Sequence, residues 1–327
     1  MRRRLSVRQE RWPTRAAFVI ARGAKTEAHV IVVEIEQAGV VGRGEAVPYA
    51  RYGQTMDGEL SRLESLRAAV EQGADRRELQ DLAPAGAARN ALDCALWDLE
   101  AKLSGKPAWE TAGLSGLVPV TTCFTLSLDE PHAMARAARL AADRPILKLK
   151  IGGPGDLDRV EAVRGAAPSS RLVVDANEGL EFEDLRRLAP ELARLGVAMI
   201  EQPLKASDDA ALDGYASPVL LCADESLHTR ADLAACARRY GAVNIKLDKC
   251  GGLTEALAVA AQARTLGLQV MAGCMVATSL AMAPAMILAQ GAQVVDLDGP
   301  LLLARDREPG LTFTGSVIAP PERQLWG

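Results

Sequence analysis

Seven apolar segments decide the fold of this chain: ILKLK (146–150), RLVVD (171–175), AMIE (198–201), VLLCAD (219–224), NIKLDK (244–249), LQVMAGC (268–274) and QVVDLD (293–298). Each has the pattern of a buried strand and carries a charged or polar group at or near its end. An eighth segment, VTTCFTLS (120–127), precedes them and supplies the first strand. Successive ends lie roughly 20 to 27 residues apart, the length of one strand, one helix and two loops in a (β/α)8 barrel.

The strand ends carry carboxylates and lysines, which a parallel barrel gathers on one face. The side chains concerned are Lys148, Lys150, Asp175, Glu201, Asp224, Lys246, Asp296 and Asp298. Asp175, Glu201 and Asp224 end three consecutive strands with no His or Cys beside them. Such a hard, oxygen-only set suits Mg²⁺ rather than zinc. We therefore predict one Mg²⁺ per subunit, held by these three carboxylates.

Each of these charged residues also has an ordinary structural explanation. A single Asp at a strand end is usually a helix N-cap or part of a surface turn. Asp296 and Asp298 fit a salt-bridged barrel rim, and Arg22 fits a plain surface arginine. Lys249 is interpreted as the structural partner of a neighbouring carboxylate. Three carboxylates at successive strand ends, with lysines on both sides, favour a metal site over separate caps.

The first third of the chain has a different pattern. FVIARG (18–23) and HVIVVEIEQAGVVGRGEAV (29–47) alternate as antiparallel strands do, with Gly39 and Gly42 predicted to form turns, and two helical patterns follow. We predict an α+β capping domain over residues 1–115 and a modified TIM barrel, (β/α)7β, over residues 116–303. The βα rhythm is lost in residues 304–327, which are expected to pack back on the capping domain.

Composition excludes several classes of protein. The chain has 42 acidic and 38 basic residues without a basic stripe, which argues against nucleic acid as a partner. It has six scattered cysteines and no CxxC pair, as expected of a cytoplasmic protein with reduced thiols. Polar residues interrupt the apolar stretches at the N-terminus, so neither a signal peptide nor a membrane span is expected.

The lysines predict proton transfer. Lys148 and Lys150 alternate onto the same side of one strand, so both ammonium groups enter the barrel mouth. Lys246 lies on the sixth strand, across the barrel, so Lys150 and Lys246 can face each other over a bound substrate. Two opposed bases are what a racemase or epimerase needs. A lysine base must lose its proton part of the time, and we expect Lys148 and the metal ion to lower its pKa.

Five motifs together resemble the enolase superfamily, in its muconate lactonizing enzyme subgroup. They are Lys148-x-Lys150, VVDAN with Asp175, IEQP with Glu201, ADES with Asp224 and NIKLDKCGG with Lys246. The resemblance covers nearly the whole chain. It implies a capping domain over the barrel mouth, and lysine bases acting with Mg²⁺ are a known feature of the superfamily. Within the subgroup, the chain is most similar to dipeptide epimerases that act on L-Ala-D/L-Glu.

This resemblance implies a 1,1-proton transfer at the α-carbon of the C-terminal residue of a dipeptide. Lys150 and Lys246 would exchange the proton, and Lys148 would steady the enediolate oxygen. Asp296 and Asp298 would hold the free ammonium, as their charge also suggests. Arg22 would bind the distal carboxylate, with Lys25 as a helper. Other residues implied to line the cleft or cover it are Thr125, Cys274, Met275 and the Tyr49 to Tyr52 region.

Alternatives remain open at this point. The same site chemistry serves an N-acylamino acid racemase, an o-succinylbenzoate synthase and a muconate cycloisomerase, whose substrates carry no free ammonium. A catalytically silent barrel is disfavoured because no predicted ligand or base is missing. The small-molecule dipeptide is the expected partner, with a role in murein peptide recycling. The resemblance also suggests a homo-oligomer, since the family often forms symmetric assemblies.

Overall fold

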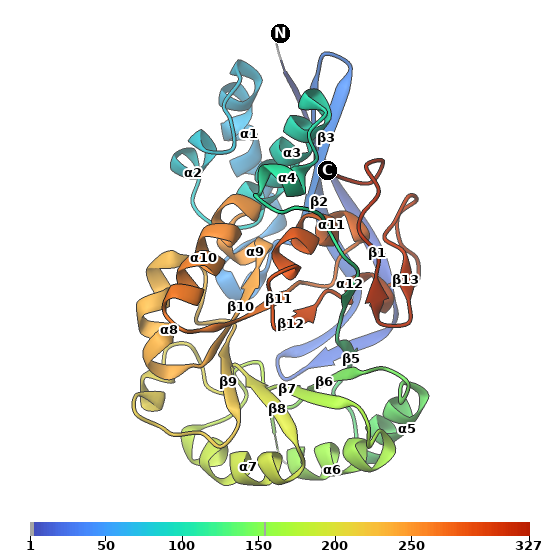
Figure 1. Cartoon of the computed structure of the whole chain (residues 1–327), viewed down its shortest axis with the longest axis vertical. Helices are drawn as coiled ribbons and strands as arrows, with labels where there is room; N and C mark the ends of the chain where they lie inside the picture. Colours follow the sequence, from blue (N-terminus) through green and yellow to red (C-terminus); the bar gives the residue numbers. More distant parts are fainter. Residues whose placement is uncertain (1–2, 154) are drawn as a thin grey trace.

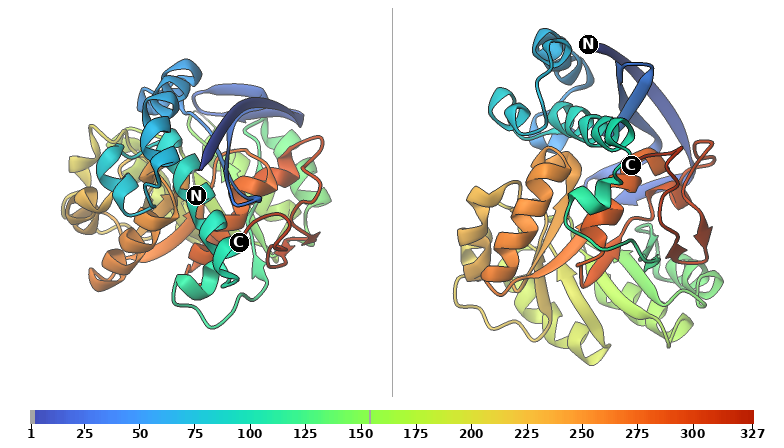
Figure 2. Two further views of the ribbon diagram at one scale, coloured as in Figure 1. Left: turned by 90° about the horizontal axis from the view of Figure 1, so that it is seen from above. Right: turned by 45° about the horizontal axis from the view of Figure 1, so that its top comes forward.

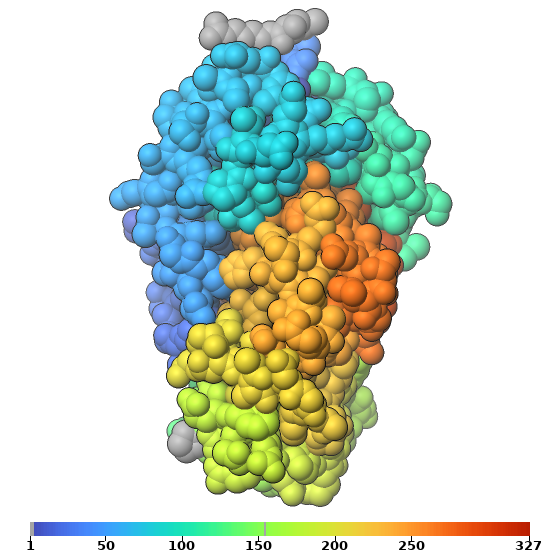
Figure 3. All heavy atoms as spheres, turned by 90° about the vertical axis from the view of Figure 1, so that its left-hand side faces the viewer, coloured from blue at the N-terminus to red at the C-terminus, as the bar shows by residue number. Residues whose placement is uncertain are grey.

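The structure is a computed structural model that describes residues 3–153 and 155–327. A capping part, formed by the first third of the chain, lies above a barrel formed by most of the remainder (Figure 1). In the space-filling view, blue and teal atoms of the capping part lie directly on yellow and orange atoms of the barrel (Figure 3). The fold class predicted from the strand rhythm is confirmed. The domain boundaries at residues 115 and 303 stay predictions.

The capping sheet is antiparallel and has the strand order β1-β2-β3. Its strands are β1 (Arg4–Ile20), β2 (Gly23–Gln37) and β3 (Val40–Ala46). β1 and β2 form one long hairpin whose pairing shifts between Pro13 and Phe18. Its turn, Ala21 and Arg22, reaches down to the barrel (Figure 1). A segment from the start of the chain thereby reaches the level of the barrel strand ends.

The β2–β3 turn lies at Ala38 and Gly39, both with positive φ (54° and 78°), as two-residue hairpins require. Gly42, predicted to be a turn residue, lies within β3 instead. A Cβ at Gly44 would lie 2.1 Å from the carbonyl oxygen of Ala91, so β3 and its covering helix pack too closely for a side chain. The capping helices are η1 (Ala50–Tyr52), α1 (Met56–Gln72), α2 (Glu78–Leu82), α3 (Ala87–Ser104) and α4 (Ala108–Thr111).

The barrel sheet has eight parallel strands in the order β12-β11-β10-β9-β8-β7-β6-β5. They are β5 (Phe124–Leu126), β6 (Ile146–Lys150), β7 (Arg171–Asp175), β8 (Val197–Glu201), β9 (Leu220–Ala223), β10 (Ala242–Lys246), β11 (Gln269–Gly273) and β12 (Val294–Asp296). The first and last strands meet through single contacts: Cys123 N donates to Val295 O at 2.8 Å, and Leu297 N donates to Thr122 Oγ1 at 2.8 Å. The strand ends therefore ring one mouth, under the capping part (Figure 2).

Helices surround the sheet in chain order. They are α5 (Pro131–Leu140), α6 (Asp156–Ala166), α7 (Phe182–Arg194), η2 (Asp209–Leu212), η3 (Arg230–Asp232), α8 (Leu233–Arg239), α9 (Leu247–Cys250), α10 (Leu253–Thr265), α11 (Ser279–Ala289) and α12 (Gly299–Leu302). The βα rhythm is broken once: a 3₁₀ turn, η2, stands between β8 and β9 where an α-helix is expected. Pro203, Gly214 and Pro218 lie in this connection and disfavour a longer helix.

The last residues contact both parts of the molecule. β13 (Phe313–Thr314) and β14 (Val317–Ile318) pair with β4 (Val120–Thr121) in a small antiparallel sheet. Further on, Trp326 Nε1 donates to Cys94 O at 2.9 Å on helix α3. In the two described stretches, no helix combines the length and the apolar character needed to cross a bilayer.

Candidate active site

The charged strand ends predicted from the sequence lie together at the barrel mouth. Lys150 on β6 is in register with Asp175 on β7, which is in register with Glu201 on β8. Asp224 follows β9 directly, and Lys246 ends β10. The mouth opens into a cavity of about 670 Å³. Its lining includes Arg22, Thr125, Lys148, Lys150, Asp224, Lys246, Cys274, Met275, Asp296 and Asp298. Asp175 and Glu201 are fully buried beside it.

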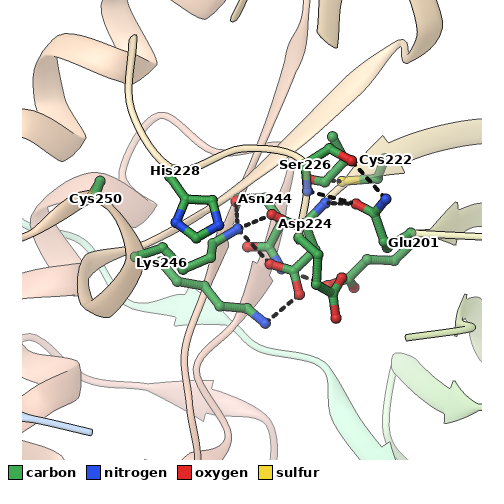
Figure 4. Close-up of polar contacts among 12 residues, drawn as sticks. Glu201, Cys222, Asp224, Ser226, His228, Asn244, Lys246 and Cys250 are labelled. Carbon is green, nitrogen blue, oxygen red and sulfur yellow. Dashed lines mark hydrogen bonds and ion pairs between the residues drawn. The ribbon is translucent and has the colours of Figure 1, made fainter. Parts of the chain in front are cut away.

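Each of the three lysines predicted to act in catalysis contacts a carboxylate. Lys150 Nζ lies 2.6 Å from Asp175 Oδ2. Lys246 Nζ lies 2.6 Å from Asp224 Oδ2, a contact drawn in Figure 4. The Lys148 ammonium is surrounded by three carboxylates, at 2.7 Å from Glu201, 2.7 Å from Asp296 and 3.2 Å from Asp175. Buried charges are tolerated when they are paired in this way. The site is therefore a nearly continuous network of alternating charge.

Neighbouring carboxylates raise the pKa values of two lysines of the site. Burial lowers the pKa of Lys148, but Asp296, Glu201 and Asp175 outweigh it and raise the pKa above its usual value. For Lys246, burial is likewise outweighed, by Asp224 and then Glu201, and the pKa is raised. The lowering of a catalytic lysine pKa by Lys148 and the metal ion together stays a prediction. The carboxylates lie within hydrogen-bond distance, and their attraction exceeds the repulsion between lysines.

The carboxylates differ among themselves. Burial opposes ionisation of Asp224, but Lys246 and Lys249 hold its pKa well below the usual range. Asp175 behaves in the same way, because Lys150 and Lys148 lower its pKa despite burial. Glu201 is different, since burial and then the charge of Asp175 raise its pKa to about 7. Two of the three predicted ligands are therefore anionic at neutral pH, and the third is poised to lose its proton.

The three carboxylates offer only oxygen ligands, which a hard cation prefers, but their side chains are not arranged around a common point. Within 3–153 and 155–327, no three His, Cys, Asp or Glu side chains stand in a metal-holding geometry. The lysines take up oxygens that a cation would use. Glu201 Oε2 nevertheless accepts no hydrogen bond from a described residue, although it touches Lys148, and Asp296 Oδ1 has no such partner either. Buried oxygens in this state are suited to binding a cation.

The strand-eight pair is partly engaged by the protein itself. Asp296 Oδ2 accepts from Lys148 Nζ at 2.7 Å, and Asp298 Oδ2 accepts from the backbone N–H of Thr125 at 2.6 Å. Burial, and then the charge of Asp296, raise the pKa of Asp298 from 3.8 to about 7. Burial also raises the pKa of the Cys274 thiol, so this thiol is a neutral neighbour of the pair. Both carboxyl groups border the cavity.

The raised pKa of Asp298 predicts a pH-dependent stability of the metal-free protein. The unfolded chain releases this proton near pH 3.8 and the folded protein near pH 7. Stability from this group is therefore fully present below pH 3.8 and is lost as the pH rises to 7, with a slope of about 1.4 kcal/mol per pH unit. The pKa of Glu201 is also raised to about 7, so this group likewise lowers stability as the pH rises. Asp298→Asn is expected to flatten this decline in urea unfolding with chelator present; an unchanged slope would contradict the assignment.

Three residues hold the ligands in place: Lys249, which the sequence analysis singled out, and Gln202 and Asn244, which it did not. Gln202 Oε1 accepts from Asp224 N at 2.8 Å and from Ser226 N at 3.1 Å. Asn244 Nδ2 donates to Glu201 Oε1 at 2.7 Å. Lys249 Nζ lies 2.6 Å from Asp224 Oδ1, as its interpretation as a structural partner requires. Asn244 had a signal, since it alternates onto the same side of β10 as Lys246. Gln202 had none.

The capping part supplies Arg22 and Lys25. Arg22 donates to Asn177 O at 2.6 Å and lies 2.8 Å from Glu225 Oε1, so it is bound by the barrel rather than exposed as a plain surface arginine. Lys25 Nζ lies 4.5 Å from the centre of the Tyr49 ring. Both border the cavity. The structure thus brings every residue predicted for the site to the barrel mouth, and the roles of these residues stay predictions.

Comparison with known proteins identifies the family. The mandelate racemase/muconate lactonizing enzyme N-terminal domain matches residues 2–113, and the enolase C-terminal domain-like family matches residues 133–323. The chain is 47% identical to L-Ala-D/L-Glu epimerase of Escherichia coli (strain K12) over 314 residues, covering 95% of this chain and 98% of that protein. It is 43% identical to N-acetyl-D-glutamate racemase of Pseudoalteromonas sp over 300 residues, covering 91% and 95%.

A solved structure agrees. An enolase family member from Agrobacterium tumefaciens, with homology to dipeptide epimerases, was crystallised with bound sodium and L-Ala-L-Glu. It is 48% identical, superposes with a TM-score of 0.98 and covers 99% of this chain and 100% of its own. The chain therefore belongs to the mandelate racemase and muconate lactonizing enzyme family of the enolase superfamily, and it is an isomerase of the racemase and epimerase class.

Proposed function

We propose that this enzyme epimerises dipeptides of the L-Ala-D/L-Glu type at the α-carbon of the C-terminal residue, in a Mg²⁺-dependent 1,1-proton transfer. The observation that carries the proposal is the placement of two lysines. Lys150 ends β6 and Lys246 ends β10, four strands further round the sheet, and both border the cavity. A substrate held between them has one ammonium or amine on each face of its α-carbon.

The proposed chemistry assigns each lysine a task. One of Lys150 and Lys246 accepts the α-proton, and the other returns a proton to the opposite face. Lys148, buried among three carboxylates, donates to the oxygen that becomes negative in the enediolate. When bound by Asp175, Glu201 and Asp224, Mg²⁺ supplies positive charge that offsets the charge developing on the substrate carboxylate. Asp224 and Glu201, as ligands of the ion, would attract Lys246 less strongly, so the interaction that raises the pKa of Lys246 would weaken.

Substrate recognition is proposed to use charge at both ends of the cavity. Asp296 and Asp298 hold the free ammonium of the dipeptide, and Arg22 receives the distal carboxylate. Thr125, Cys274 and Met275 line the remaining wall. Relatives named as epimerases of L-Ala-D/L-Glu support this choice of substrate. L-Ala-D-Glu is a piece of the bacterial cell wall, so a role in murein peptide recycling follows from the same proposal.

A second candidate is racemisation of an N-acylated glutamate. It is favoured by the engagement of Asp296 with Lys148 and by the pKa of about 7 at Asp298, which together leave less negative charge for an ammonium. A relative of 43% identity carries the name N-acetyl-D-glutamate racemase. An N-acetyl group would replace the ammonium with a neutral amide, for which a protonated Asp298 is a suitable donor.

The deciding experiment offers L-Ala-L-Glu, L-Ala-D-Glu and N-acetyl-D-glutamate side by side in D₂O with Mg²⁺. Exchange and inversion at the α-carbon are followed by NMR, with a chelator control. We expect inversion of the free-amine dipeptides, and we expect Asp298→Asn to weaken it at least tenfold, since a charge-assisted contact is lost. Inversion confined to N-acetyl-D-glutamate would overturn the dipeptide assignment in favour of the second candidate.

A further inference from the structure

Two loops of the capping part meet one barrel residue, Glu178. The first loop is the β1–β2 turn with Arg22, and the second is the connection from β3 to α1 (47–55), with Tyr49 and Arg51. Glu178 lies in the loop that follows β7, three residues after Asp175. Its side chain is only 5% exposed. A buried acid between two cationic loops has a position that neither the fold nor the proton chemistry requires.

Glu178 binds both loops directly. Arg51 Nε and Nη2 each donate to its carboxylate, at 2.6 Å and 2.6 Å, in a bidentate pair. Arg22 Nη1 lies 3.4 Å from Oε2. The backbone N–H of Ala206, in the next barrel loop, donates to Oε1 at 2.9 Å. One carboxylate thus joins two capping loops to two barrel loops, and bidentate arginine pairs are among the stronger charge-assisted contacts.

The backbone at Glu178 is in an unfavourable conformation. Asn177 and Glu178 both have positive φ, 45° and 69°, although neither is glycine. Such residues persist where the surroundings over-determine them, and they concentrate at functional sites. Asn177 also connects the loop to the site, because its N–H donates to Asp175 Oδ1 at 2.9 Å and its carbonyl accepts from Arg22 at 2.6 Å. The strained loop therefore contacts a predicted ligand on one side and the capping part on the other.

The turn of the capping hairpin is seated beside this contact. Ala21 packs against two barrel glycines: a Cβ at Gly152 would lie 2.6 Å from the Ala21 Cβ, and one at Gly179 would lie 3.3 Å from it. Only a glycine surface lets the turn approach so closely. Close packing of Ala21 against these glycines fixes the position of the turn. The carboxylates of Glu178 and Glu225 orient the guanidinium group of the adjacent Arg22.

We propose that Glu178 is a positioning residue: by binding Arg51 and Arg22 together, it fastens both capping loops to the barrel mouth and orients Arg22 toward the distal carboxylate of the substrate. The identity of that substrate carboxylate rests on the proposed function, whereas the attachment of the two loops to the barrel does not. Arg22 also contacts Tyr49 Oη at 3.3 Å, so each loop supports the other. Loss of Glu178 removes the carboxylate that pairs with Arg51 among the described residues, and it leaves Arg22 held by Glu225, Asn177 and Tyr49.

The first test needs no substrate. Hydrogen–deuterium exchange of the intact enzyme is compared for the native chain, Glu178→Gln and the control Glu183→Gln, which removes an exposed acid from α7. We expect Glu178→Gln to raise exchange about tenfold in residues 18–26 and 48–55, with helix α3 unchanged. Glu183→Gln should match the native chain. Equal protection of both loops in Glu178→Gln would overturn the fastening role.

The second test uses kinetics. Glu178→Gln and Arg51→Met should each raise KM for L-Ala-D-Glu about tenfold with little change in kcat, and the double variant should be no worse than either single one. L-Ala-D-Gln, which lacks the distal charge, should be affected much less. Equal losses with both dipeptides, or a fall in kcat alone, would contradict a role through Arg22. If no dipeptide is turned over by the native enzyme, the proposed function fails, while the exchange result still decides the fastening.

Discussion

Lys150→Arg and Lys246→Arg are each expected to lower the rate of epimerisation by about 10⁴-fold. Arginine keeps the positive charge that Asp175 and Asp224 need, at the positions where the lysines now lie 2.6 Å from them. It cannot release a proton at any working pH, because its pKa exceeds about 12. The substitution therefore separates the charge of the side chain from its capacity to transfer a proton.

The sharper readout of these variants is one-sided exchange. In D₂O, each variant should still exchange the α-proton of the one isomer whose face its remaining lysine serves, without inverting it. The isomer affected should differ between the two variants, which would assign each lysine to its isomer. Lys205→Arg, at an exposed lysine outside the cavity, is the matched control and should behave as the native enzyme. Inversion at near-native rates in either site variant would disprove the two-base mechanism.

Asp224→Asn is expected to abolish Mg²⁺ binding and also to destabilise the metal-free protein by about 3–5 kcal/mol. The stability effect has its own cause. Asp224 is fully buried, and its carboxylate lies 2.6 Å from both Lys246 and Lys249. Removing its charge leaves two buried ammonium groups without their main counter-ion. Urea unfolding in chelator measures this loss, and titration calorimetry with Mg²⁺ measures binding.

Glu201→Gln is the contrasting variant. Its carboxyl group is partly protonated near neutral pH, because its pKa is raised to about 7, and its lysine partner keeps Asp175 and Asp296. We therefore expect loss of Mg²⁺ binding with a much smaller loss of stability than in Asp224→Asn. Equal destabilisation of the two variants would show that the buried lysines depend on Glu201 as much as on Asp224, contrary to this prediction. Retained Mg²⁺ affinity in both would remove them as ligands.

The strand ends of the barrel could be predicted because their information is local. Side chains alternate along a strand, and a parallel barrel brings all strand ends to one face, so Lys148, Lys150 and Lys246 are placed by period and topology alone. The type of chemistry follows from residue type, since carboxylates without His or Cys suit a hard cation. The fold class and the charged strand ends needed no knowledge of contacts between distant segments. Arg22, Thr125, Cys274 and Met275 were named only because of the resemblance to the family.

Other features were decided only by tertiary structure. The raised pKa of Lys246 comes from Asp224, which follows β9, and from Glu201 on β8. The support of Asp224 by Gln202 depends on a loop conformation with positive φ. The fastening contacts of Glu178 join residues 127 and 156 positions apart in the chain. Local pattern specifies which side chains point into the mouth. Electrostatic energies depend on distances of a few ångströms between segments remote in sequence, and those distances exist only once the whole chain has packed.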